Sequence, residues 1–132
     1  MATGDEPARA VFRLAPTSDS VTAARRQVSD VLRRWSFHDL LNDVAVAVTE
    51  LVTNAVLHAG SDVSVGIARA PGRVRIVIGD ASEIRPERRM TDPLALSGRG
   101  MRMVDDMADA WGCDVVEGGK LIWVDLSHAG VR

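Results

Sequence analysis

Residues 49–60 read T-E-L-V-T-N-A-V-L-H-A-G, and this stretch carries the strongest structural signal in the chain. Within it, Glu50 and Asn54 stand four positions apart in a run that is otherwise largely apolar. At about 3.6 residues per helical turn, the two side chains lie on one face of a helix. A carboxylate accepts protons, and a carboxamide oxygen is a ligand for a hard cation such as Mg²⁺. The stretch therefore predicts a helix with an apolar side for the core and a polar side that is either a ligand site or a solvated stripe.

The composition limits the classes of protein to which the chain can belong. It has 132 residues, 16 basic and 18 acidic side chains, and a net charge of −2. This length suits one domain with one core, and the balanced charge provides no basic surface for nucleic acid. Two Phe, three Trp and no Tyr are too few for a base-stacking surface. The single cysteine, Cys113, forms no disulfide within the chain and has no zinc-binding spacing around it.

We expect a cytoplasmic protein that makes no contact with a membrane or directly with nucleic acid. No stretch approaches the length of a membrane span, and the polar first residues lack the apolar run of a signal peptide. No repeat, linker or low-complexity segment divides the chain. We therefore predict a single domain over residues 1–132, with its core over about residues 11–126.

Hydrophobic spacing predicts two helices in the first half of the chain. The first follows capping residues at 17–20 and runs to about Trp35. The second runs over about residues 40–58, with Asp39 as its N-terminal cap and Gly60 as its stop. Its core-facing side chains are expected to be Leu40, Val44, Ala47, Val48, Leu51 and Ala55.

The second half of the chain predicts two hairpins, a long loop and a third helix. Alternating apolar residues around the Pro71-Gly72 turn indicate the first hairpin, and residues 113–126 indicate the second, with its turn at Gly118-Gly119. Residues 81–98 have little periodicity and read as a long loop of the kind that serves as a lid or a binding loop. The third helix opens at residues 98–100, and its buried stripe is expected to be Met103, Val104, Met107 and Trp111.

The order of these elements predicts the fold class. A short strand at about residues 11–14 precedes two helices, a hairpin, the long loop, the third helix and a last hairpin. Such an order favours an α+β two-layer sandwich, in which three helices cover one face of a mixed, mostly antiparallel sheet.

Three further positions carry side chains or backbone suited to a nucleotide. Asp80 follows a buried strand, where its carboxylate can accept a hydrogen bond from an exocyclic amine such as that of adenine. The segment Ser97-Gly98-Arg99-Gly100-Met101 starts a helix, and free N–H groups at a helix start attract phosphate. Lys120, in the expected turn of the last hairpin, can reach a phosphate. Taken singly, the alternatives are a turn residue, a flexible helix entry and a surface lysine.

In this order the motifs resemble the Bergerat-fold (GHKL) ATPases, the superfamily of gyrase, the heat-shock chaperone ATPase, sensor histidine kinases and MutL. The N box of that superfamily, E-x-x-x-N, matches Glu50 and Asn54. The aspartate of its G1 box matches Asp80, and the G-x-G of its G2 box matches Gly98 and Gly100. The chain departs from the pattern in two places: both glycines of the usual D-x-G-x-G are missing, and Lys120-Leu121 stands where many relatives have an adenine-contacting threonine.

The small anti-sigma-factor serine kinases are the branch that the motifs resemble in most detail, through E-L-V-T-N-A-V-L-H-A, D-P-x-x-x-S-G-R-G-M and G-K-L-I-W-V-D-L. The resemblance implies ATP and Mg²⁺ as cofactors. Asn54 would hold Mg²⁺, and Glu50 would be the general base toward a serine or threonine hydroxyl. Asp80 would bind adenine, and Arg99 would add charge at the transferring phosphoryl group. The other expected nucleotide-binding residues are Ser82, Ser97, Gly98, Gly100, Met101 and Lys120.

Three functions are compatible with the sequence. The favoured one is a serine/threonine protein kinase that binds a sigma factor and phosphorylates a STAS-type anti-sigma antagonist, and thereby regulates transcription. The second is a nucleotide-binding regulator that acts by protein contact without significant kinase activity. The third is a scaffold that has lost nucleotide binding. The resemblance also allows a homodimer, since kinases of this branch are commonly dimers.

Overall fold

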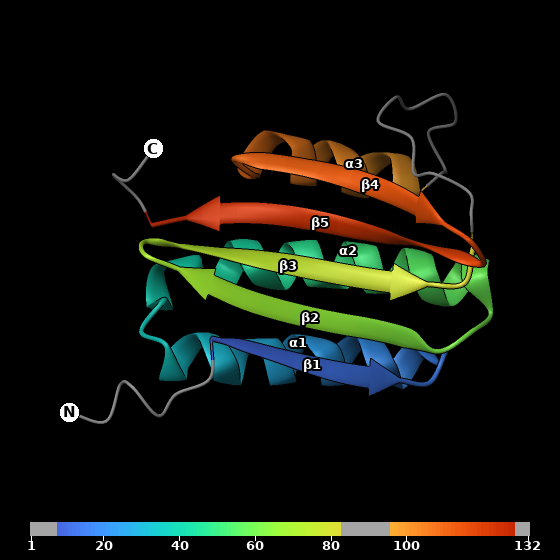
Figure 1. Ribbon diagram of the computed structural model, residues 1–132, viewed down its shortest axis with the longest axis horizontal. Coiled ribbons are helices and arrows are strands. Elements are labelled where there is room, and N and C mark those ends of the chain that lie inside the picture. Colours follow the sequence, from blue (N-terminus) through green and yellow to red (C-terminus); the bar gives the residue numbers. More distant parts are fainter. Residues whose placement is uncertain (1–7, 83–95, 129–132) are drawn as a thin grey trace.

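The computed structural model describes residues 8–82 and 96–128, and for residues 96–100 it describes the backbone alone. These residues form five strands, three α-helices and one short 3₁₀ helix (Figure 1). They are β1 (Arg9–Leu14), α1 (Ser18–Arg34), η2 (His38–Leu40), α2 (Leu41–Ala59), β2 (Val63–Ala70), β3 (Arg73–Asp80), α3 (Leu96–Met107), β4 (Ala110–Val116) and β5 (Gly119–Ser127). The predicted α+β sandwich is confirmed.

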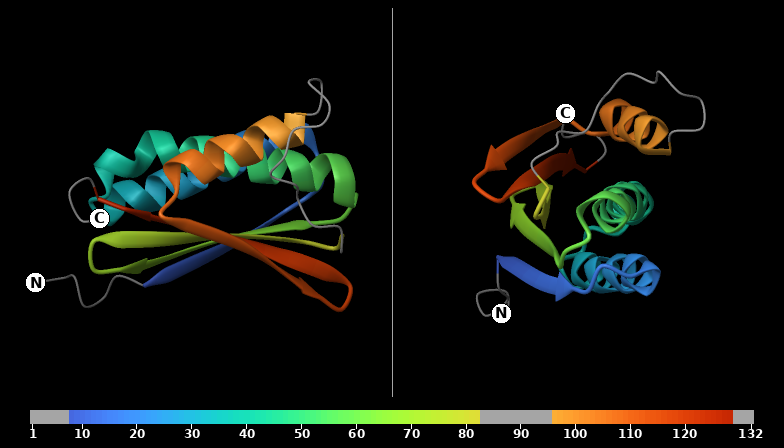
Figure 2. Two further views of the ribbon diagram at one scale, coloured as in Figure 1. Left: turned by 90° about the horizontal axis from the view of Figure 1, so that it is seen from above. Right: turned by 90° about the vertical axis from the view of Figure 1, so that its right-hand side faces the viewer.

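The strands form one sheet in the order β1-β2-β3-β5-β4. Each pair of neighbours is antiparallel, so the sheet expected to be mixed is antiparallel at every pairing among the described residues. The three helices lie side by side on one face of the sheet, with α2 between α1 and α3 (Figure 2). β3 ends, β5 begins and α3 begins at the same end of the molecule, which is the right-hand end in Figure 1.

The core fills the space between the helices and the sheet. Alternate residues of the three central strands face the helices, as the period of two along a strand requires. All six side chains expected on the core face of the second helix are buried. The main strand residues beneath them are Val63, Val65, Ile67, Val74, Ile76, Ile78, Ile122, Val124 and Leu126.

The third helix differs from its prediction in both position and buried face. It begins at Leu96, two residues before the expected start, and ends at Met107. Met101 and Val104 are buried, whereas Met103 is 46% exposed. Trp111 belongs to β4, because the chain joins the sheet where the Asp109 N–H donates to the Asp125 carbonyl at 2.9 Å. Residues 83–95 of the expected loop lie outside the described residues.

The predicted cap of the second helix is wrong, whereas its predicted stop is confirmed. Asp39 lies in η2 and contacts His128, with 2.7 Å between Oδ1 and Nδ1, and no side chain in the described part of the chain caps the start of α2. Gly60 follows the end of α2 at a φ of 65°, a left-handed conformation in which the missing Cβ avoids strain.

The stretch His38–Ala59 is long and apolar enough to cross a membrane by length and composition alone, contrary to the prediction that no stretch qualifies. In this fold its apolar residues serve another purpose. Val44, Val48 and Leu51 are buried between the helices and the sheet. The stretch is therefore apolar because it forms a helix of the core.

Two leucines of α2, one buried and one exposed, allow the contribution of core packing to stability to be tested. Leu51 is 1% exposed and Leu57 is 62% exposed. We expect Leu51→Ala to lower the free energy of unfolding by about 2–5 kcal/mol, because it leaves a cavity in the core. Leu57→Ala should change it by less than about 0.5 kcal/mol. Urea denaturation of both variants measures the difference, and equal effects would contradict the packing described here.

A glycine at the start of β5 permits close packing against the end of β3. A Cβ at Gly119 would collide with the carbonyl oxygen of Asp80, whereas a Cβ at Gly66 would make only ordinary contacts, the nearest at 3.8 Å. Gly119→Ala should therefore lower the free energy of unfolding by about 1–3 kcal/mol through overpacking. Gly66→Ala, the matched control, should leave it unchanged or slightly raised. The two denaturation midpoints test this expectation, which fails if Gly119→Ala is as stable as the control.

Candidate functional site

Glu50 and Asn54 lie on the flank of α2 that faces α3. Thr49 marks the opposite flank, because its Oγ1 accepts a hydrogen bond from Arg25 of α1 at 3.4 Å. Successive residues are about 100° apart around a helix, so Glu50 and Asn54 fall on the other side of the core-facing Leu51. Both side chains are half-buried. The predicted shared face is therefore confirmed, and it is the face of α2 on the side of α3.

Partial burial changes the acid–base chemistry of Glu50. Desolvation raises the pKa of its carboxyl above the ordinary glutamate value, since burial penalises the charged form. A carboxylate with a raised pKa holds a proton more strongly once it has accepted one. This shift suits a group that takes a proton from a hydroxyl in a reaction near neutral pH.

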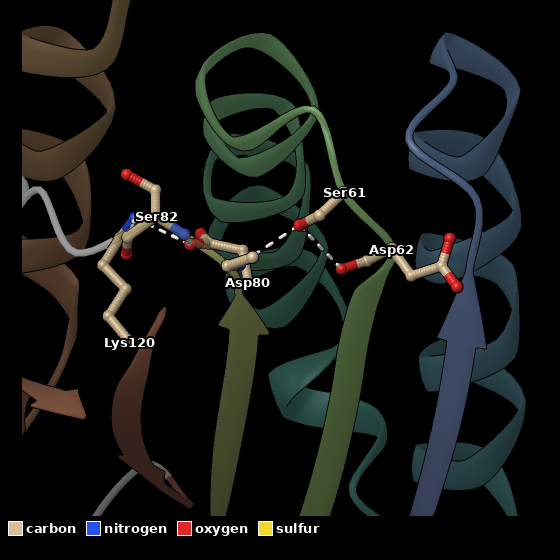
Figure 3. A network of polar contacts seen from close by, with 6 residues as sticks. Ser61, Asp62, Asp80, Ser82 and Lys120 are labelled. Carbon is tan, nitrogen blue, oxygen red and sulfur yellow. Dashed lines mark hydrogen bonds and ion pairs between the residues drawn. The ribbon is translucent and has the colours of Figure 1, made fainter. Parts of the chain in front are cut away.

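Asp80 and Lys120 form a buried ion pair at the end of the two central strands. The antiparallel register of β3 and β5 places them directly opposite each other. Lys120 Nζ lies 3.0 Å from Asp80 Oδ1, and the side chains are 8% and 2% exposed respectively (Figure 3). Each alternates with a core isoleucine on its strand, so the pair lies on the helix-covered face of the sheet.

Ser82 completes this polar group through its backbone. Its N–H donates to Asp80 Oδ1 at 2.8 Å, and its carbonyl accepts from Lys120 Nζ at 3.3 Å (Figure 3). Between them, the Ala81 N–H donates to Ser61 Oγ at 3.1 Å. The segment after β3 is thus held from one side by β5 and from the other by the connection between α2 and β2. Ser61 was not predicted, and its only sequence signal is its position directly after the helix stop at Gly60.

The predicted position of Lys120 in a hairpin turn is wrong. The turn consists of Glu117 and Gly118, and Gly118 adopts a φ of 81° that suits glycine. Lys120 already belongs to β5, where the alternation of side chains directs it inward rather than into solvent. Its contact with a phosphate remains a prediction. Its contact with the carboxylate expected to read adenine was not predicted.

The first turn of α3 contains the predicted phosphate-binding residues Ser97, Gly98, Arg99 and Gly100. The first four N–H groups of a helix have no partner within the helix, so this turn supplies donors at the end of the molecule where Asp80 lies. The side chains of these four residues lie outside the described part of the chain. Met101 is fully buried in the core, so only its backbone is suited to a ligand.

A hollow of about 450 Å³ has Asp80 and Lys120 at its edge, but residues that face away from the helices make up much of its lining. Its lining includes Ser64, Gly79 and Leu121, each of which alternates with a core residue on its strand. It is therefore separated by the sheet from the flank that carries Glu50 and Asn54. We do not assign the nucleotide to this hollow.

The residues present fit a magnesium ion that arrives with a nucleotide. Among residues 8–82 and 96–128, no group of three His, Cys, Asp or Glu side chains is placed to hold a metal. Mg²⁺ commonly keeps several waters and binds through one or two protein oxygens together with substrate phosphates. The half-buried carboxamide of Asn54 supplies one such oxygen on the flank toward α3.

Comparison with known proteins agrees with the fold. The family model described as histidine kinase-like ATPase domain matches residues 14–126. No curated protein matches the chain in sequence. The chain is similar in structure to the RsbU and RsbW domains of Rv1364c from Mycobacterium tuberculosis, with a TM-score of 0.69, 19% identity, and coverage of 92% of this chain and 32% of that chain.

A second solved structure has the same fold. It is the catalytic domain of the histidine kinase ThkA, with a TM-score of 0.52, 12% identity, and coverage of 89% of this chain and 95% of that chain. At such identities the two structures demonstrate a shared fold, and the family follows from the match over nearly the whole sequence. This chain belongs to the histidine kinase-like ATPase domain family, whose architecture is the Bergerat fold.

Proposed function

We propose that this domain binds ATP with Mg²⁺ and transfers the γ-phosphoryl group to a serine or threonine hydroxyl of a protein partner. The observation that carries the proposal is the half-buried Glu50–Asn54 pair on the flank of α2 that faces α3. A nucleotide between α2 and α3 would have its phosphates near the first turn of α3. Its base would lie toward Asp80, on the same face of the sheet.

In this arrangement each residue has a separate task. Glu50 accepts the proton of the attacking hydroxyl while the new O–P bond forms and ADP leaves. Asn54 holds Mg²⁺, which supplies charge neutralisation at the phosphates when it is bound. Arg99 and the N–H groups of residues 97–101 stabilise the charge on the transferring group. Asp80 and Ser82 orient the base end of the nucleotide.

The partners we propose are a sigma factor and a STAS-type anti-sigma antagonist in the cytoplasm. This proposal is supported by the motifs of the chain and by its structural similarity to a protein with a domain named RsbW. A regulator that acts by protein contact without significant kinase activity is the second candidate. The altered G1 segment and last hairpin favour that candidate, because both change contacts that the superfamily pattern provides for adenine. We also propose that the protein forms a homodimer.

Phosphoryl transfer can be tested with labelled ATP, Mg²⁺ and STAS-type proteins from the same genome. We expect phosphoserine or phosphothreonine on one of them, and Asn54→Ala should lower the rate by at least about 10-fold because it removes a metal ligand. Asn42→Ala, an exposed position in the first turn of α2, is the matched control and should leave the rate unchanged. Nucleotide binding without transfer to any of these proteins would favour the contact-only regulator.

The pH dependence of the transfer tests the role of Glu50. A general base works only when it is deprotonated, so the rate should fall as the pH drops through the raised pKa of Glu50. This acidic limb should lie at a higher pH than the ordinary pKa of a glutamate carboxyl, because burial raises the pKa of Glu50. Glu50→Gln should lower the rate by about 10²–10⁴-fold and remove the limb. Glu117→Gln, in the exposed hairpin turn, should retain both the rate and the limb.

The stability of Glu50→Gln provides an independent check on the same carboxyl. Because the pKa is higher in the folded state, ionised Glu50 destabilises the fold at neutral pH, and this cost disappears below the unfolded pKa. The variant should therefore be as stable as the wild type or more stable at pH 7, and the two should converge in acid. A variant that is less stable at pH 7 would show that Glu50 has a structural role.

A further inference from the structure

We propose that Lys120 is a base-specificity residue, which donates a hydrogen bond to a ring nitrogen of the nucleobase beside the exocyclic amine that Asp80 accepts. The inference rests on the proposed binding of ATP, and it assigns to Lys120 a role at the base rather than at a phosphate. The starting observation is that Lys120 Nζ contacts Asp80 Oδ1 at 3.0 Å on the helix-covered side of the sheet.

Among the described residues, the hydrogen bonds of this pair leave one acceptor and one donor available. Asp80 Oδ1 receives both the Ser82 N–H and Lys120 Nζ, whereas no hydrogen bond among the described residues reaches Oδ2. Lys120 Nζ carries three hydrogens, and the described residues accept two of them, at Asp80 Oδ1 and the Ser82 carbonyl. An acceptor oxygen and an ammonium donor therefore lie side by side (Figure 3).

This pattern matches the Watson–Crick edge of adenine. Adenine presents the N6 amine as a donor directly beside N1, which is an acceptor. The carboxylate of Asp80 would accept from N6, and the ammonium of Lys120 would donate to N1. Enzymes that take a base into a pocket read this edge by the same kind of paired contacts. A charged donor makes a stronger hydrogen bond than the neutral hydroxyl expected from the superfamily pattern.

Lys120 carries the single lysine ammonium group of the chain. Lys120 is the only lysine among the 16 basic residues, and the other 15 are arginines. An ammonium is a compact donor, whereas a guanidinium is a planar fork that needs more space. The single lysine of the chain is thus found where a compact donor can lie beside a buried carboxylate.

The first experiment uses the wild-type protein and two nucleotides. Calorimetry in Mg²⁺ compares ADP with 1-deaza-ADP, in which a C–H replaces N1 and the N6 amine is retained. Loss of a hydrogen bond to a charged donor corresponds to a factor of about 10–100 in affinity, so 1-deaza-ADP should bind that much more weakly. Equal affinities would overturn the role of Lys120 and leave the proposed function standing, whereas absence of ADP binding would overturn both.

The second experiment observes the lysine directly. Because the chain has one lysine, selective ¹⁵N-lysine labelling gives a single Nζ signal. ADP should shift this signal, and 1-deaza-ADP should shift it much less. A lysine that only neutralises Asp80 would respond alike to both nucleotides, and that outcome would overturn the inference.

A variant separates recognition of the base from stability of the fold. Lys120→Met should bind ADP and 1-deaza-ADP with similar affinity, both close to that of 1-deaza-ADP for the wild type. The variant leaves a buried carboxylate without its partner and is expected to be less stable, so the fold is checked by circular dichroism. The wild-type comparison does not depend on this variant. Tighter binding of ADP by Lys120→Met would show that the lysine obstructs the base, contrary to the proposal.

Discussion

The apolar side of α2 packs against the sheet while its two flanks meet α1 and α3, and this burial constrains the rest of the molecule. A helix held on three sides cannot rotate without exposing core residues such as Val48 and Leu51. The orientation of α2 about its own axis therefore determines which of its polar residues lie at the edge of the core. Glu50 and Asn54 occupy the flank toward α3, so the packing that stabilises the fold also directs the two candidate catalytic groups.

The antiparallel register of β3 and β5 is the second constraint, and it acts at the end of the site that we propose for the base. A slip of β5 by one residue would turn Lys120 to the face of the sheet opposite Asp80. Such a slip would also bury outward-facing side chains such as Trp123, so the core opposes it. The buried ion pair therefore has a fixed place although its own contribution to stability is small, since desolvation offsets much of the attraction between buried charges.

The sequence was sufficient to predict the elements whose signals are local. The core face of α2, the stop at Gly60 and the hairpin of β2 and β3 all follow from periodicity and turn chemistry. The contact of Lys120 with Asp80 could not be predicted in this way, because it depends on the pairing of strands that are separated by α3 and β4. Trp111 was placed in a helix for a related reason: its apolar spacing continues from α3, whereas its pairing with β5 is determined by tertiary structure.

The missing glycines of the G1 segment have a structural counterpart in the contacts after Asp80. In the usual D-x-G-x-G, glycines allow the backbone to adopt conformations that other residues avoid. Here the Ala81 N–H is bonded to Ser61 Oγ, and Ser82 is bonded through both its N–H and its carbonyl. The segment that leaves β3 is thus held by specific partners rather than left pliable. A carboxylate that is anchored in this way presents its remaining oxygen in one direction, and that constraint favours selection of a base by geometry over adaptation of the site to the base.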